Sequence, residues 1–121
     1  MMNAEASNRT DEPFPLEWTA WRALWREWIG ARLADGTLTR SSYRFPPPNF
    51  LADEVLGVFG VPRGDGSGRT VELSEVTFPA LDGSRRDARY VGITFGAASG
   101  IEPGGVARTF AELETVLGID V

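Results

Sequence analysis

The sequence predicts an α+β domain in which a long N-terminal helix and a short C-terminal helix pack on a small antiparallel sheet. Apolar residues recur with a helical period through Leu16–Ala34, which predicts the long helix. Apolar and polar residues alternate in Arg69–Phe78 and Ala88–Phe95, a pattern typical of two half-buried strands that pair antiparallel. Thr109 occupies the N-cap position of a capping box before Phe110–Leu117, which predicts the short helix.

The long helix carries every tryptophan of the chain, at spacings of three, four and three residues: Trp18, Trp21, Trp25 and Trp28. These side chains occupy an arc of roughly 80° on a helix. Such a stripe either covers the core of the domain or also contacts a partner or a second copy, since tryptophan is frequent in binding hot spots. Arg32 falls inside the arc and Arg22 flanks it, so we expect either guanidinium to stack on an indole.

The middle of the chain is less regular. Thr37–Phe45 is weakly strand-like, and Pro46–Pro48 predicts a stiff extended connector. Apolar residues spaced four apart predict a second helix over Phe50–Phe59. Gly57 is unfavourable inside a helix, and a strand over Val55–Val61 is the competing interpretation.

Three further local patterns concern the sheet and its connections. The alternation in the first long strand changes phase near Ser74 and Glu75, which predicts a β-bulge there. Asp82-Gly83 supplies the turn between the two long strands. Gly96–Ala107 is rich in glycine and small residues and is expected to form a mobile surface loop, and Gly118 fits the C-cap of the last helix.

The chain is predicted to consist of a mobile tail, residues 1–15, and one domain, residues 16–121. The tail lacks the apolar core of a signal peptide, and no apolar run reaches the roughly 18 residues that cross a bilayer. The chain contains no cysteine, so it has no disulfide framework. We therefore expect a cytoplasmic protein that does not bind membranes.

The residue types that are missing limit the chemistry. The chain has no lysine, histidine, cysteine or glutamine, and all twelve basic residues are arginine. Histidine acid–base catalysis, cysteine nucleophiles, Schiff-base lysines and ordinary zinc sites are therefore excluded. Gly64–Thr70 does not form a phosphate loop, because Arg69 replaces the lysine and a strand follows, and Ser99 has no base to activate it. We expect no catalytic residue, no cofactor and no metal.

Charge is unevenly distributed along the chain. The net charge is −5, but residues 13–48 hold five arginines against three acids and residues 49–121 hold six against eleven. An acidic body argues against nucleic-acid binding and suits a partner protein with a basic surface. Glu72 and Glu75 are the candidates for that contact. Three arginines near the hairpin turn are candidates for binding a phosphate or an acidic partner: Arg85, Arg86 and Arg89.

These observations favour a non-enzymatic protein-binding module, such as a small acidic inhibitor, an immunity-type protein or an adaptor. Two alternatives remain open. One is a small enzyme or ligand-binding domain that uses arginines and carboxylates at the glycine-rich loops. The other is a structural subunit of a larger assembly, or a homo-oligomer, that docks through the tryptophan-bearing helix.

Overall fold

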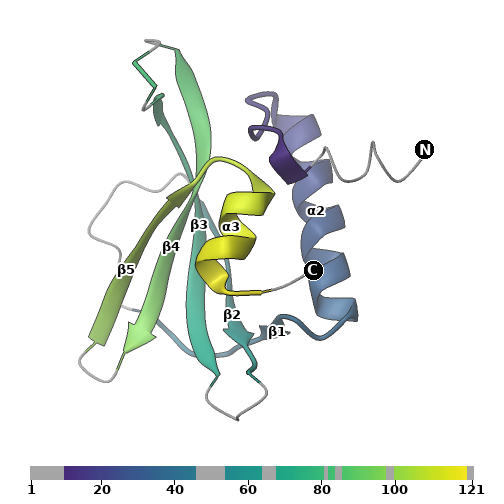
Figure 1. Cartoon of the computed structure of the whole chain (residues 1–121), viewed down its shortest axis with the longest axis vertical. Coiled ribbons are helices and arrows are strands. Elements are labelled where there is room, and N and C mark those ends of the chain that lie inside the picture. The colour runs from purple at the N-terminus through teal and green to yellow at the C-terminus, as the bar shows by residue number, and fades with distance from the viewer. Residues whose placement is uncertain are drawn as a thin grey trace.

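The computed structural model confirms the α+β class: a five-stranded antiparallel sheet in the order β1-β2-β3-β4-β5, with both helices on one side (Figure 1). It describes residues 10–45, 54–63, 68–80, 82–83, 86–97 and 100–119. The elements are α2 Trp18–Ala34, β1 Thr39–Arg40, β2 Glu54–Val61, β3 Arg69–Pro79, β4 Asp87–Ala97, β5 Gly100–Ala107 and α3 Phe110–Leu117. The five strands form a simple meander, since neighbours in the sheet are also neighbours in the chain.

Helix α2 starts at a glutamate cap. The carboxylate of Glu17 accepts hydrogen bonds from the backbone N–H groups of Thr19 at 2.8 Å and Ala20 at 3.0 Å. These bonds satisfy donors that the first turn of a helix leaves free, and they hold the pKa of Glu17 below its usual value. The sequence offered no Ser, Thr, Asp or Asn at this position, which is why the cap was not predicted.

The core is built on three of the four tryptophans. Trp21, Trp25 and Trp28 are buried, and Phe110 of α3 stacks on two of them. The Phe110 ring lies 5.2 Å from Trp28 and 6.4 Å from Trp21, measured between ring centroids. Each buried indole contributes about 4–6 kcal/mol of hydrophobic stabilisation. The rest of the domain therefore covers most of the stripe.

Phe14 extends the domain into the segment that was expected to be a mobile tail. Its side chain is buried, with its ring 4.9 Å from Trp21 and 4.8 Å from Phe110. Its backbone N–H donates to the carbonyl of Arg108 at 2.9 Å. The domain therefore begins before residue 16, while residues 1–9 lie outside the described ranges.

The helix predicted over Phe50–Phe59 is wrong, because its described part belongs to β2, as the competing strand prediction had it. Gly57 shows why. A Cβ atom at Gly57 would lie 2.7 Å from Cζ of Phe59, two residues further along the strand. The glycine lets the Phe59 ring lie against the backbone and reach the core. Residues 50–53 lie outside the described ranges.

The bulge predicted near Ser74 and Glu75 was placed on the wrong strand. The register shift lies opposite Leu73 and Ser74, but on the neighbouring strand β2 between Val55 and Gly57, whereas β3 pairs with β4 without interruption. The phase change in β3 has another origin. Glu75 lies on the same face of the sheet as the core residue Leu73, so a charged side chain occupies an inward position.

The glycine-rich segment expected to form a loop contains the edge strand β5, which pairs with β4. A Cβ atom at Gly104 would lie 2.7 Å from Ile93 and 2.8 Å from Phe95, so only glycine permits this close approach. Pro103 is tolerated because the outer side of an edge strand needs no N–H donor. Residues 98–99, with Ser99, lie outside the described ranges.

Helix α3 has the predicted bounds and the predicted N-cap, Thr109, but Glu112 accepts from the Arg108 N–H at 3.2 Å instead of the Thr109 N–H that a capping box requires. The Glu112 N–H donates to Oγ1 of Thr109 at 3.0 Å. Gly118 ends the helix in the left-handed conformation at φ 72°. The weak strand expected over Thr37–Phe45 shrinks to β1, Thr39–Arg40, which pairs with β2.

Candidate functional site

A buried ion pair joins the sheet to the start of α2. Nη1 of Arg89 lies 3.0 Å from Oε1 of Glu75, and the two side chains are only 6% and 2% exposed. The Trp21 indole N–H donates to Oε2 of the same carboxylate at 2.5 Å. Arg89 also donates to the carbonyls of Pro15 at 3.0 Å and Leu16 at 2.8 Å. We call these residues the Glu75 network.

The Glu75 network fixes the chain just before α2 and uses the polar groups of Glu75 and Arg89 within the protein. The Glu75 carboxylate contacts the Trp21 indole and the Arg89 guanidinium. Nε and both terminal nitrogens of Arg89 contact groups of the protein itself. The interpretation of Glu75 and Arg89 as surface contacts is therefore wrong, because both side chains are buried.

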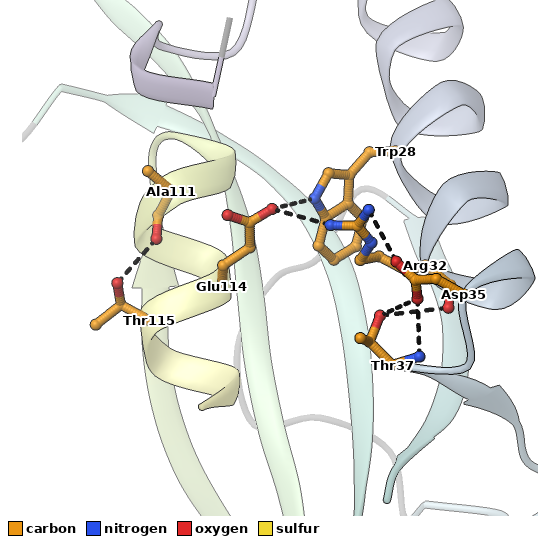
Figure 2. A network of polar contacts seen from close by, with 7 residues as sticks. All are labelled: Trp28, Arg32, Asp35, Thr37, Ala111, Glu114 and Thr115. Carbon is orange, nitrogen blue, oxygen red and sulfur yellow. Dashed lines mark hydrogen bonds and ion pairs between the residues drawn. The ribbon is translucent and has the colours of Figure 1, made fainter. Parts of the chain in front are cut away.

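A second network joins the two helices (Figure 2). Glu114 reaches from α3 toward α2, where its Oε2 accepts from the Trp28 indole at 2.9 Å and lies 3.5 Å from Nη1 of Arg32. Arg32 also pairs with Asp35 at 3.1 Å, and the Thr37 hydroxyl donates to Asp35 at 2.6 Å. The Thr37 hydroxyl and N–H, together with Arg32, hold the pKa of Asp35 below its usual value. We call these residues the Glu114 network.

The two arginines expected to stack on indoles behave differently. The Arg22 guanidinium lies 5.0 Å from the Trp18 ring centroid, so the expectation is confirmed for Arg22. Arg32 instead forms ion pairs with Asp35 and Glu114. Trp18 is 48% exposed, so among the tryptophans it is the one whose side chain remains available to a partner.

Glu72, the other proposed acidic contact, lies on the face of the sheet away from the helices and is also buried. Thr94 is its partner across the ladder, and Ser74 follows it on the same face. Burial raises the pKa of Glu72. The two glutamates expected to form an acidic surface are therefore both buried, on opposite faces of β3.

The arginine cluster expected at the hairpin turn does not form within the described residues. Arg85 lies outside them, and Arg86 is exposed, with its carbonyl accepting from the Ala80 N–H at 2.8 Å. Arg89 belongs to the Glu75 network. Asp82, next to the turn, pairs with Arg108 at 3.1 Å.

A hollow of about 270 Å³ lies between α2 and β2. Three arginines line it, Arg22, Arg26 and Arg40, and one carboxylate, Glu54, pairs with Arg22 at 3.2 Å. Its apolar lining consists of Trp25, Ile29, Val55, Leu56 and Phe59. We call it the α2–β2 hollow. Arg26, Arg40 and Glu54 were not singled out from the sequence. The one signal that pointed here was the excess of arginine in residues 13–48.

A second hollow, of about 380 Å³, lies on the other flank of α2, beside the segment that leads into the helix. Its charged lining residues are Glu12 and Glu27, and its apolar lining includes Phe14, Leu24 and Phe110. The two hollows along α2 therefore carry opposite charge.

The described part of the chain contains no group of three or more carboxylates placed to hold a metal ion. Within the same ranges, no helix combines the length and apolar character needed to span a bilayer. Comparison of the chain with models of protein families, with curated proteins and with solved structures finds no match.

Proposed function

We propose that this chain is a non-enzymatic protein-binding module that contacts its partner around Trp18 and the α2–β2 hollow. The observation that carries the proposal is the exposure of Trp18, 48%, on a helix whose other tryptophans are buried. Val55, also exposed, lines the hollow together with Arg22, which stacks on Trp18. Exposed aromatic and apolar side chains beside arginines are typical of interface hot spots.

The position of Trp18 suits recognition because the side chain is held before any partner arrives. Arg22 packs on its ring at 5.0 Å and itself pairs with Glu54 at 3.2 Å. Arg89 lies 5.6 Å from the same ring centroid. An aromatic side chain held in this way loses little conformational entropy on binding, so more of its contact energy contributes to affinity.

The polar interior supports a non-enzymatic role. Glu75 and Glu114 each accept from an indole and pair with an arginine, so both carboxylates are used to join segments of the fold. The chain also lacks histidine, lysine and cysteine, the usual acid–base and nucleophilic side chains.

The test is the effect of Trp18→Ala on binding. The tagged chain is used to isolate partners from its native host, and each purified partner is then titrated against wild type, Trp18→Ala and Tyr43→Ala. Tyr43 is the matched control, an aromatic residue that is 50% exposed and does not line the hollow. Trp18→Ala is expected to weaken binding by at least about thirtyfold, the effect of a hot spot of about 2 kcal/mol. A partner bound equally well by wild type and Trp18→Ala would contradict the proposal.

A further inference from the structure

We infer that the α2–β2 hollow binds an acidic segment of the partner protein, one that combines carboxylate side chains with an apolar residue. This inference rests on the proposed function and specifies the chemistry of the partner. It also reverses the charge expected from the sequence, because the two glutamates predicted to meet a basic partner are buried.

The first argument is charge. Three guanidinium groups and one carboxylate give the hollow a local charge of +2, in a chain whose net charge is −5. Arg26 and Arg40 are exposed and make no ion pair within the described residues. Arg22 and Arg26 are four residues apart on one helix, where like charges repel, and only Arg22 has a carboxylate partner in Glu54. An acidic ligand would relieve the remaining repulsion.

The second argument is the apolar lining. Trp25 and Phe59 are buried beneath the arginines, with their ring centroids 6.4 Å apart, while Val55 remains exposed at the rim. An apolar side chain of the partner would cover Val55 and exclude water from the charged groups. Carboxylate–guanidinium contacts are stronger when water is excluded, and arginine can bind a carboxylate through two parallel hydrogen bonds.

The third argument is the size of the hollow and the place where a carboxylate would bind in it. At about 270 Å³, the hollow is smaller than the pockets of about 300–1,000 Å³ that usually hold small molecules. It suits one or two side chains projecting from a partner. Glu54 already pairs with Arg22, so it repels a second carboxylate there and favours placement near Arg26 and Arg40.

The inference can be tested with synthetic peptides and the indole N–H signals of the tryptophans in NMR spectra. The probe is a short peptide of glutamate and aspartate interspersed with leucine and phenylalanine. The control peptide replaces each carboxylate by its amide. The acidic peptide should shift the signal of Trp25, which lines the hollow, and that of Trp18, whose ring packs against Arg22 of the lining. It should leave Trp21 and Trp28 unchanged, because their N–H groups bond to Glu75 and Glu114 inside the protein.

Charge reversals give the quantitative test. Arg26→Glu and Arg40→Glu should each weaken binding of the acidic peptide by about tenfold, and raising the salt concentration should weaken wild-type binding. Arg63→Glu is the matched control, since it makes the same change of charge at an exposed arginine outside the hollow. Its effect should stay within about threefold, the residual from long-range charge.

Several results would overturn the inference. The amide peptide could bind as tightly as the acidic one, or the acidic peptide could leave the Trp25 signal unshifted. Inorganic phosphate could also produce the same shifts, which would indicate a site for small anions.

Failure of this inference can be distinguished from failure of the proposed function. If a partner that depends on Trp18 binds Arg26→Glu and Arg40→Glu as well as wild type, the acidic-segment inference fails and the binding function stands.

Discussion

The Glu75 and Glu114 networks contain the same three side-chain types but differ in burial. In each, a tryptophan N–H and an arginine share one glutamate. Glu75 and Arg89 are 2% and 6% exposed, whereas Glu114 and Arg32 are 12% and 15% exposed. The ion-pair distance is 3.0 Å in the first and 3.5 Å in the second. Water can therefore reach the carboxylate and guanidinium of the Glu114 network more readily than those of the Glu75 network.

The two networks also join different parts of the chain. The Glu75 network links the middle of the sheet to α2 and to the two carbonyls that precede it. The Glu114 network links α3 to the last turns of α2 (Figure 2). A charge buried without its partner is far more costly than one that can still reach water. The comparison therefore predicts unequal effects from chemically identical substitutions.

The largest effect is expected from Glu75→Gln. The substitution keeps the shape and an acceptor for Trp21 but leaves the Arg89 guanidinium buried without a counter-charge. The free energy of unfolding should fall by about 3–5 kcal/mol, measured by urea denaturation at neutral pH. A loss below about 1 kcal/mol would show that water reaches this pair and would remove the contrast between the two networks.

A double substitution sharpens this prediction. In Glu75→Leu/Arg89→Met both charges are replaced by apolar side chains, so no unpaired charge remains. The double variant should be more stable than Glu75→Gln. It should not recover fully, because the Trp21 indole loses its acceptor and the carbonyls of Pro15 and Leu16 lose the donors that Arg89 supplies.

Glu114→Gln, the matched change in the other network, should cost less. The amide still accepts from Trp28, and Arg32 keeps Asp35 as a counter-charge. The expected loss is about 1–2 kcal/mol in the same urea experiment. Equal losses for Glu75→Gln and Glu114→Gln would contradict the argument from burial.

Trp18→Phe separates the exposed tryptophan from the buried ones. Its effect on stability should stay within about 0.5 kcal/mol, since the side chain is half exposed. Wild-type fluorescence should contain a component that acrylamide quenches readily and a blue-shifted component that it quenches poorly. The variant should lose the readily quenched component. If that component persists, one of the three core tryptophans must be reachable by the quencher.

The parts of the fold that the sequence predicted are those with local determinants. Helix α2 follows from its apolar period, and α3 from a cap whose donor and acceptor are three residues apart. The strands β3 and β4 follow from alternation. The strand β2 was only the competing interpretation, because the apolar spacing in Phe50–Phe59 favoured a helix, and β5 was missed because its glycine-rich sequence is typical of a loop. Only the tertiary structure reveals that Gly57 and Gly104 leave room for the side chains of Phe59, Ile93 and Phe95.

The charged residues were harder to place, for the same reason. Glu75 looks like a surface residue until Trp21 and Arg89, which are distant in the chain, are brought beside it. The α2–β2 hollow likewise takes its arginines from α2 and β1 and its carboxylate from β2. The sequence therefore indicated which part of the chain has an excess of positive charge. It did not reveal which charged side chains meet in the folded protein.

The smallest change in the free energy of unfolding is expected from Glu72→Gln, and this substitution should raise stability instead of lowering it. Burial raises the pKa of this carboxyl in the folded chain above the ordinary value of 4.5 that it has when unfolded. Between these two values the folded protein binds more protons than the unfolded chain. Glu72 therefore lowers stability as pH rises through this interval, and the loss stays constant above it.

Glu72→Gln should remove this loss, so the variant should be more stable than wild type at neutral pH and indistinguishable from it below the ordinary pKa of glutamate. The measurement is the difference in unfolding free energy between the two proteins across acidic and neutral pH. Taking the difference cancels Glu17 and Asp35, whose lowered pKa values make stability fall on acidification in both proteins. A variant that is less stable than wild type at neutral pH would contradict this prediction. It would show that the fold stabilises the charged carboxylate of Glu72, as it does that of Glu75.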